Sequence, residues 1–310
     1  MGCTDTNSAD SGADSNPLTD SGEDPTIGED LDGDGASSAI DCDDDDASIF
    51  PWDRDGDGSF EGCGWSTSAG YEHSCGLNSS GTVVCWGVNF QDQVSPVPTR
   101  SFTSVSAGAS YTCGLQEDGL VECWGSYTAG PPTVPVKHLS ARDYHACAVT
   151  EDGAAECWGH PDGTETDYGQ QDPPDEIFTH IAAGSFHTCA LTQSGTAVCW
   201  GRGDEDQLTA PDSTFDSLSA CYLHTCGVTL SGDVECWGAR NGWSYDYGQS
   251  VPPTGDFEQI SAGRYHTCGV RSGGSLECWG IDDGSYHDHG QALPPSGEFQ
   301  SVSAGGDHSC

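Results

Sequence analysis

Short segments of alternating apolar and polar residues recur along the chain from residue 75 onward. In the first copy the period-two rule puts Cys75 and Leu77 on the same face of a strand pair as Val83 and Cys85. The position of Val83 is apolar in every later copy, where it is Val121, Ala155, Ala197, Val234 and Leu276. The next position is a glutamate in four copies, namely Glu122, Glu156, Glu235 and Glu277. The pattern predicts strand pairs with one packed face and one face that is at least partly exposed to water.

Each of six copies contains two cysteines ten positions apart, with Trp-Gly directly after the second cysteine and a glycine six positions after the first. In the first copy this spacing centres the turn on Ser80, with Gly81 in the last position, where a left-handed residue is favoured. Opposed cysteines in an antiparallel pair lie within disulfide reach. We therefore predict six β-hairpins, each with a cross-strand disulfide. The predicted pairs are Cys75–Cys85, Cys113–Cys123, Cys147–Cys157, Cys189–Cys199, Cys226–Cys236 and Cys268–Cys278.

The hairpins belong to a longer repeat. Their first cysteines are spaced by 34 to 42 residues, a segment like Phe102–Gly108 precedes most of them, and Gly-Gln and Pro-Pro follow several. A histidine stands two positions before the cysteine in all copies but one, which has Tyr111; these are His73, His145, His187, His224, His266 and His308. Each unit supplies about three short strands, too few to bury a face alone, so the period predicts stacked or radial repeats.

The stretch from Ser261 to Gly280 combines S-A-G-x-x-H-T-C with the C-W-G ending of the hairpin. In this combination the chain resembles the repeats of the regulator of chromosome condensation family, and the short spacing resembles its exported bacterial members. The resemblance covers about residues 64–310 and implies an all-β fold, a seven-bladed β-propeller whose last blade is incomplete in this chain. Arg142 and Cys221 stand where other copies have glycine, so we expect the third and fifth blades to be locally altered.

Residues 30–63 form a separate acidic module, which contains two D-x-D-G-D-G motifs. Carboxylates at positions 1, 3 and 5 of a turning loop, followed by glycine, are typical of calcium sites. We predict structural calcium held by Asp30, Asp32, Asp34 and Asp41 in the first motif and by Asp53, Asp55, Asp57 and Glu61 in the second. Cys42 and Cys63 can form a disulfide within this module. The alternative is an acidic spacer that binds calcium only weakly.

Residues 1–29 are polar and small, and their composition predicts a disordered tether. We interpret Gly2-Cys3 as the end of a bacterial lipoprotein signal, with lipid on Cys3. The alternatives are an incidental start and N-myristoylation, which the M-G-x-x-x-[ST] pattern also fits.

Composition restricts the cellular locations and the classes of partner that are compatible with this chain. Seventeen cysteines, twelve of them in the hairpin pairs, predict an oxidising, extracellular or cell-surface location. A net charge of -42 makes nucleic acid a poor partner, and no apolar run approaches the length of a membrane span. Zinc is disfavoured because its paired cysteine ligands are normally much closer in sequence.

Residues that break the repeat are the candidates for function. Three longer loops, 160–176, 239–255 and 281–297, carry the aromatic residues Tyr168, Trp243, Tyr245, Tyr247 and Tyr286, which equivalent loops would gather on one propeller face. We predict a non-catalytic protein that binds a protein partner there, with packing against neighbouring loops as the simpler alternative. The recurrent histidines would form a repeated hydrogen bond inside each blade. Other candidate functions are a glycan-binding or enzymatic propeller, with sugar stacked on Trp243 and Tyr245, and nucleotide exchange on a GTPase.

Overall fold

The computed structural model describes residues 66–126, 130–159, 166–239 and 245–310. These residues form eighteen strands in six three-stranded antiparallel sheets, and none forms a helix. The sheets are β1 (Ser66–Ala69), β2 (His73–Leu77), β3 (Val83–Gly87); β4 (Phe102–Ala107), β5 (Tyr111–Gln116), β6 (Val121–Gly125); β7 (Val136–Arg142), β8 (His145–Thr150), β9 (Ala155–Trp158); β10 (Phe178–Ala183), β11 (His187–Thr192), β12 (Ala197–Gly201); β13 (Phe215–Cys221), β14 (His224–Thr229), β15 (Val234–Gly238); and β16 (Phe257–Ala262), β17 (His266–Arg271), β18 (Leu276–Gly280).

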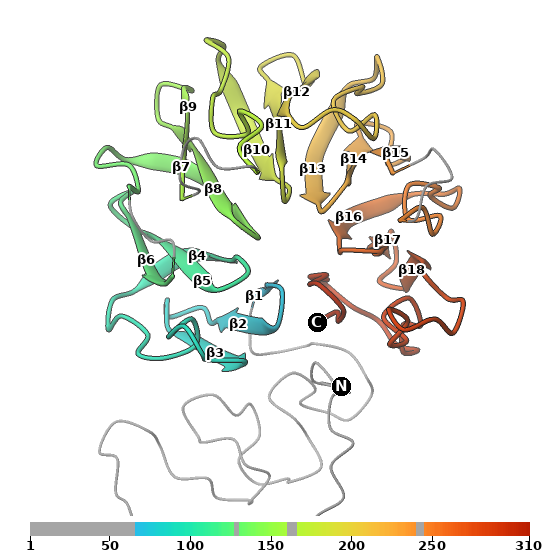
Figure 1. The fold of residues 1–310 in the computed structure, drawn as a ribbon, viewed down its shortest axis with the longest axis horizontal. Coiled ribbons are helices and arrows are strands. Elements are labelled where there is room, and N and C mark those ends of the chain that lie inside the picture. The colour runs from blue at the N-terminus through green and yellow to red at the C-terminus, as the bar shows by residue number, and fades with distance from the viewer. Residues whose placement is uncertain (1–65, 127–129, 160–165, 240–244) are drawn as a thin grey trace, which may run out of the picture.

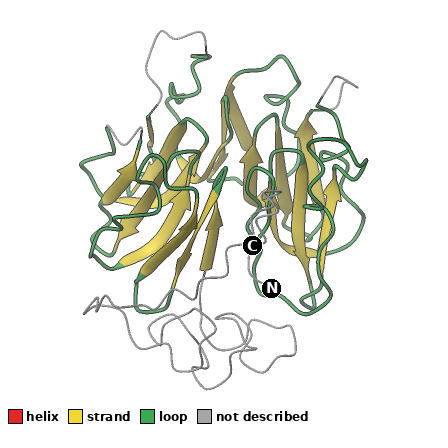
Figure 2. Cartoon of the chain, turned by 60° about the horizontal axis from the view of Figure 1, so that its bottom comes forward, coloured by secondary structure: helices red, strands yellow, loops and turns green. Residues whose placement is uncertain are grey.

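The six sheets follow one another around a ring in chain order, so each sheet is one blade of a β-propeller (Figures 1 and 2). The first strand of each blade lines the axis, and serine hydroxyls join neighbouring first strands. Ser106 Oγ accepts from Ala141 N at 2.8 Å, and Ser219 Oγ accepts from Ala262 N at 2.9 Å. Residues 299–310 lie between the sixth blade and the first, where Ser303 Oγ accepts from Ala69 N at 2.8 Å. Residues 299–310 therefore connect the last blade of the ring to the first.

The hairpins have the register that the cysteine spacing predicts. Cys75 pairs directly with Cys85, and the disulfide that joins them has a Cα–Cα distance of 4.0 Å. The five later pairs with the same spacing are joined in the same way. Gly81 closes the turn with φ +82°, a conformation that a side chain would strain. A Cβ at this residue would also lie 2.9 Å from the Phe102 carbonyl oxygen of the next blade, so the glycine also permits the close contact between blades.

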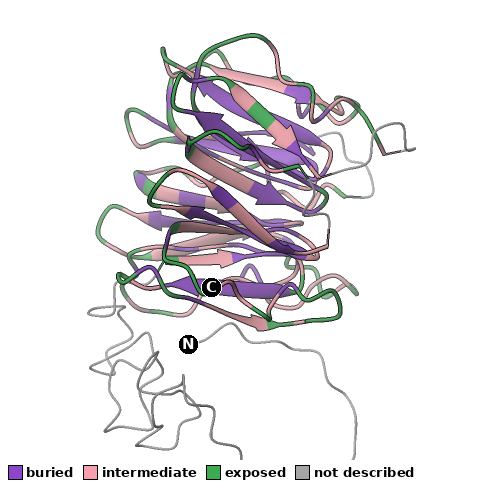
Figure 3. Ribbon diagram, turned by 90° about the vertical axis from the view of Figure 1, so that its left-hand side faces the viewer, coloured by how far each residue is buried: buried purple, intermediate pink, exposed green. Residues whose placement is uncertain are grey.

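The core lies between blades. In one junction Cys226, Val228 and Val234 of the fifth blade pack against Phe257 and Ile260 of the sixth. A tryptophan from the third strand of the following blade covers such clusters, and its indole Nε1 donates to the carbonyl of a loop glutamine. These bonds run from Trp124 to Gln93, Trp200 to Gln170, Trp237 to Gln207 and Trp279 to Gln249. Buried residues accordingly concentrate within the stacked sheets, and the exposed ones in the loops at their edges (Figure 3).

The recurrent histidines join blades to one another, and the expectation of a hydrogen bond inside each blade was wrong. His187 Nε2 lies 2.8 Å from Thr225 Oγ1 of the next blade, and His224 Nε2 lies 2.8 Å from Thr267 Oγ1. Both rings are fully buried, and this burial lowers the pKa of His187 to about 4. The histidine sequence position follows the repeat, but its partner depends on how neighbouring blades are packed.

Arg142 and Cys221 alter their blades as the sequence predicts. Strands β7 and β13 are each extended to seven residues and end at these two positions. Arg142 crosses the axis and donates to carbonyl oxygens of three other segments, Ala69 at 2.9 Å, Ala262 at 2.6 Å and Ala304 at 2.8 Å. Its Nε lies 3.0 Å from the sulfur of Cys221. Cys221 is a free thiol, and burial raises its pKa to about 11, so it is protonated at neutral pH.

Several predictions fall outside the described residues. The tether, the acidic module with its calcium ligands, Cys3, Cys42, Cys63 and Trp243 are among them. Cys310 is disulfide-bonded. No helix in the part of the chain described above is long and apolar enough to cross a membrane.

Candidate binding face

One end of the propeller carries a concentration of aromatic side chains. In each blade a short turn joins the first strand to the second, and the long loop that follows the third strand starts at the same end because the strands are antiparallel. We call this end the turn face. The turns contribute Tyr71, Tyr144, Phe186, Tyr222 and Tyr265, and the loops contribute Tyr168, Tyr245, Tyr247 and Tyr286. They form two groups, each built around one arginine.

The larger group, the Arg264 cluster, consists of Arg264 with Tyr71, Tyr222, Tyr245, Tyr247 and Tyr265. The Arg264 guanidinium carbon lies 4.9 Å from the ring centroids of Tyr222 and Tyr265 and 5.2 Å from that of Tyr71. Tyr265 is fully buried and contacts the rings of Tyr222, Tyr245 and Tyr247 at centroid distances of 5.6, 6.1 and 5.2 Å. The cluster thus gathers tyrosines from three different turns and one loop around a single cation.

Glycines in residues 299–310 make this meeting possible. Gly306 stands where the sixth blade has Arg264 and the fifth has Tyr222, and its amide donates to the Gly70 carbonyl at 3.0 Å. A Cβ on Gly306 would lie 2.7 Å from the Tyr71 carbonyl oxygen. The glycine thus permits the close approach of Tyr71, and Arg264 reaches from the sixth blade to the first and donates a hydrogen bond to the Tyr71 hydroxyl.

The cluster contains polar groups without partners. Arg264 has no carboxylate within ion-pair distance among the described residues, whereas Arg100, Arg202 and Arg271 each have one. Arg264 Nε and the Tyr265 hydroxyl are both buried and have no hydrogen-bond partner. A guanidinium has five N–H donors, and buried polar groups in proteins are normally satisfied. The Arg264 cluster therefore has donor groups that an added acceptor could satisfy.

Rings at the edge of the Arg264 cluster are open to solvent. Tyr245 is 40% exposed and Tyr286 is 87% exposed. Tyr286 contacts His287 at 5.3 Å between ring centroids, and His287 in turn contacts Tyr265 at 5.1 Å. A continuous aromatic surface therefore leads from solvent to the buried tyrosine.

The smaller group, the Arg202 cluster, consists of Arg202 and Asp204 with Tyr144, Tyr168 and Phe186. The Arg202 guanidinium carbon lies 5.5 Å from the Tyr168 ring centroid and 5.7 Å from that of Phe186. Phe186 and Tyr168 hold the repeat positions of Tyr265 and Tyr247, and the two aromatic pairs meet edge to face in both clusters. Here, however, Asp204 pairs with the arginine at 2.6 Å, and this contact lowers the pKa of Asp204.

The structure brings together the predicted partner-binding residues only in part. Tyr245 and Tyr247 lie in one cluster, Tyr286 at its edge, and Tyr168 in the other. These rings pack against neighbouring side chains, and Tyr168, Tyr245 and Tyr286 are also exposed; the binding of a partner there stays a prediction. The sequence analysis missed the turn residues, including Arg264 and Tyr265. Their signal was the pair of positions inside Gly-x-x-His, which varies from copy to copy while its flanks repeat.

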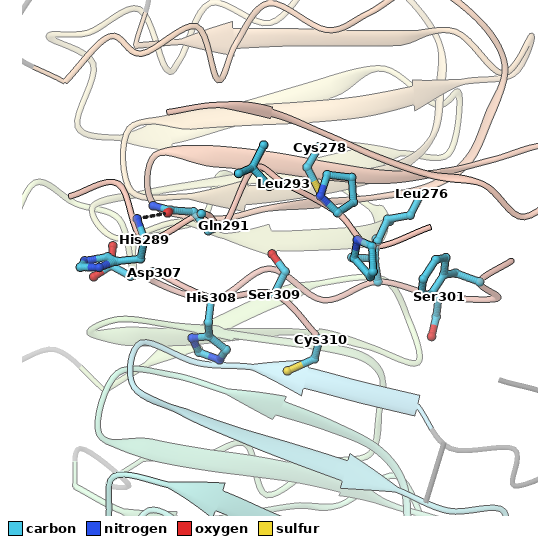
Figure 4. A pocket seen from close by; sticks show the side chains of 15 residues that line it. Leu276, Cys278, His289, Gln291, Leu293, Ser301, Asp307, His308, Ser309 and Cys310 are labelled. Carbon is cyan, nitrogen blue, oxygen red and sulfur yellow. Dashed lines mark hydrogen bonds between the residues drawn. The ribbon is translucent and has the colours of Figure 1, made fainter. Parts of the chain in front are cut away.

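A hollow in the described part of the chain lies elsewhere, beside Cys310 (Figure 4). It measures about 320 Å³ and is lined by Leu276, Cys278, Phe299 and Val302, which correspond to the residues that a tryptophan covers in other junctions. No tryptophan belongs to this junction among the described residues. The hollow therefore occupies a packing position of the repeat, and it lacks the copy-specific residues that distinguish the turn face.

The recurrent histidines of the described residues are engaged in contacts between blades. No group of three or more histidine, cysteine, aspartate or glutamate side chains in the described ranges could hold a metal ion. The buried histidines are committed to threonine or serine hydroxyls between blades. The chemical feature of the turn face is the Arg264 guanidinium, which is surrounded by tyrosine rings.

Comparison with known proteins identifies the repeat. The family model "Regulator of chromosome condensation (RCC1) repeat" matches residues 66–93, 178–207 and 257–291. These segments carry RCC1 repeats, and the described residues fold as a β-propeller. No curated protein sequence matches it. Among solved structures, it is similar to the ectodomain of the Physcomitrella patens receptor kinase CR4, with 27% identity and a TM-score of 0.64 over 77% of this chain and 67% of that one.

Two further structures share the fold. The CRINKLY WD40 ectodomain of the Arabidopsis thaliana receptor kinase ACR4 is 24% identical, with a TM-score of 0.63 over 79% of this chain and 92% of that chain. Prp20p of Saccharomyces cerevisiae, whose structure was described together with its binding properties to Gsp1p and histones, is 16% identical, with a TM-score of 0.62 over 79% and 81%.

Proposed function

We propose that this RCC1-type propeller is a non-catalytic extracellular protein that binds a protein partner through the turn face. The observation that carries the proposal is the Arg264 cluster, in which tyrosines from separate blades surround one arginine. Tyrosine and arginine are enriched at the energetic centres of protein interfaces, since they combine a large contact area with hydrogen bonding. Prp20p, a structural neighbour, has binding properties to Gsp1p and histones, and this supports a binding role for the fold.

The test uses the purified chain as bait against proteins of its native surroundings and quantifies recovery of each captured protein. Tyr286→Glu places a charge on the most exposed ring of the turn face, and Leu230→Glu is the matched control because Leu230 is 72% exposed on a hairpin turn at the opposite end. We expect a true partner to be lost with Tyr286→Glu and retained with Leu230→Glu. Capture that is equal for both variants would reject the turn face, and capture of glycans in place of protein would favour the lectin alternative.

An extracellular location is supported by the six disulfides and by the similarity to a receptor-kinase ectodomain. We further propose the bacterial surface anchor at Cys3 and structural calcium in residues 30–63. Intact mass before and after reduction, with peptide mapping, measures the disulfides and the lipid together. Calorimetric titration with calcium after chelation tests the module, and Asp32→Asn with Asp55→Asn should remove the binding heat.

We infer that residues 299–310 begin a seventh blade. Phe299 N donates to the Gly274 carbonyl at 2.7 Å, just as Phe257 N donates to that of Gly232 at 2.8 Å. Ser303 accepts from Ala69, as the other axial serines accept from the next first strand. The Ala69 amide should therefore exchange its hydrogen as slowly as the Ala141 amide, and fast exchange at Ala69 alone would contradict the inference.

A further inference from the structure

We propose that the Arg264 cluster is a docking point for one carboxylate side chain, an aspartate or glutamate presented by a partner protein. The inference rests on the proposed protein-binding function and adds the chemistry of the group that is recognised. It follows from the unpaired state of Arg264, from the aromatic rim around it, and from the way the same chain completes its second arginine–aromatic cluster.

Arg264 is one of three cations in the described ranges that have no carboxylate within ion-pair distance; the other two are Lys137 and Arg142. Arg142 differs from Arg264 because its guanidinium donates to three backbone carbonyl oxygens. The carboxylates of Asp307, Asp143 and Glu72 act on Tyr71, whose hydroxyl accepts a hydrogen bond from Arg264, and each of them raises the pKa of Tyr71. Arg264 Nε is buried and has no hydrogen-bond partner, so this donor remains for a carboxylate from outside the chain.

The Arg202 cluster provides the occupied counterpart. Its guanidinium lies beside an edge-to-face aromatic pair at the same repeat positions, and the carboxylate of Asp204 completes it, with Nη2 to Oδ2 at 2.8 Å. In the Arg264 cluster every component of this arrangement is present except the carboxylate. Carboxylate and guanidinium are geometrically matched for paired hydrogen bonds, and the tyrosine hydroxyls add further polar contacts.

The charge of the chain restricts the source of the carboxylate. A net charge of -42 repels an acidic partner and any multiply charged anion at long range. A single carboxylate on a partner surface that is otherwise neutral or basic avoids this repulsion. Tyr245 and Tyr286, both exposed, would then cover apolar side chains that flank the acidic residue on the partner.

The experiment needs no knowledge of the partner. The chain has only seven arginines, so the Nε–Hε signals of its arginine side chains can be followed individually by NMR. The probe is sodium acetate, with acetamide as its neutral isostere and sodium chloride at matched ionic strength. Arg264→Gln and Arg202→Gln assign the two signals and serve as matched variants.

We expect acetate to move the Arg264 signal in a saturable way, with a midpoint on the order of 10–100 mM for one charge-assisted contact. Acetamide and chloride should leave it in place, and Arg202 should not respond because Asp204 already occupies it. An Arg264 signal that does not move, that moves equally with acetamide or chloride, or that moves no more than Arg202 overturns the inference.

The two proposals fail separately. If acetate leaves Arg264 unaffected while Tyr286→Glu still abolishes capture of a partner, the turn face binds proteins by other contacts and only the carboxylate inference is lost. If acetate binds at Arg264 but capture does not depend on the turn face, the carboxylate site exists and the protein-binding function falls.

Discussion

The two arginine–aromatic clusters of the turn face have the same components and opposite electrostatic states. In the Arg202 cluster the charge is neutralised within four residues of chain, by Asp204, and the aromatic pair is half-exposed. In the Arg264 cluster the central tyrosine is fully buried, the arginine reaches across to another blade, and no carboxylate of the described residues pairs with it. The difference separates a self-sufficient surface feature from one that is completed by something outside the chain.

The comparison also shows why charge state, more than aromatic content, distinguishes a binding site in a repeat protein. Aromatic rings recur at equivalent repeat positions because equivalent loops place them there. A third arginine, Arg142, has its donors taken by carbonyl oxygens of three segments at the axis and is therefore structural. Arg202 Nε lies 2.6 Å from Asp204, whereas the buried Nε of Arg264 has no hydrogen-bond partner and no carboxylate within ion-pair distance among the described residues.

The largest expected effect is a loss of stability, and it should differ between the two clusters because their central rings are buried to different extents. Tyr265→Ala removes a fully buried ring that four other aromatic rings contact, so we expect a loss of about 3–5 kcal/mol in the free energy of unfolding. Phe186→Ala, at the same repeat position, should lose about half as much because its ring is only partly buried. Chemical denaturation with the disulfides intact measures both. Equal losses would mean that the two clusters are packed alike.

Acid should lower the stability of the propeller, which carries both clusters, while the Arg202–Asp204 ion pair persists. Burial lowers the pKa of His187 to about 4, and in the unfolded chain its ordinary value is 6.5. Between these values the unfolded state binds more protons, so stability falls as pH drops from 6.5 toward 4, by about 2 kcal/mol at pH 5 for this histidine. Asp204, whose pKa is lowered, stays ionised over this range.

His187→Gln isolates this term, because glutamine can keep a hydrogen bond to Thr225 and does not titrate. Melting temperatures from pH 7 to 4.5 should fall less steeply for the variant than for the wild type. Protonation of the many carboxylates affects both proteins alike and cancels in the difference. Identical slopes would show that His187 is protonated in the folded state as easily as in the unfolded one.

Substitution of Arg264 and substitution of Arg202 should have different effects on the affinity for a partner. Once a partner has been captured through the turn face, Arg264→Ala should weaken its binding at least about tenfold, since a charge-assisted contact is worth 1.5–3 kcal/mol. Arg202→Ala should change the affinity by less than about threefold, because Asp204 already satisfies that side chain. Titration calorimetry gives both dissociation constants. Equal weakening by the two substitutions would remove the distinction drawn here.

The substitution with the smallest expected effect on stability would make the Arg202 cluster resemble the Arg264 cluster. Asp204→Asn removes the internal carboxylate of Arg202, and we expect less than about 1 kcal/mol of lost stability because the Asp204 side chain is 58% exposed. The Arg202 Nε–Hε signal should then begin to respond to acetate as that of Arg264 does. An Arg202 that stays unresponsive in Asp204→Asn would show that the aromatic setting of Arg264, and not the free charge alone, creates the site.

Local spacing in the sequence was sufficient for the hairpins. The ten-residue cysteine interval and the glycine at Gly81 fix turn length and register, because both are set by backbone geometry over a dozen residues. The repeat period was sufficient to predict stacked or radial repeats, since units of three strands cannot bury a face alone, and the resemblance to a known repeat family favoured the radial arrangement. The substitutions at Arg142 and Cys221 were visible as departures from a repeated glycine, and they do alter their strands.

The tertiary structure alone decided which blades touch. The partner of His187 is a threonine 38 residues away on the next blade, so a bond expected inside the blade is found between blades. Tyr71 and Arg264, 193 residues apart, meet because the ring returns the chain to its start and Gly306 leaves space between them. Sequence patterns report contacts within one repeat, but ring closure and the charge state of Arg264 depend on contacts between repeats, which no local pattern contains.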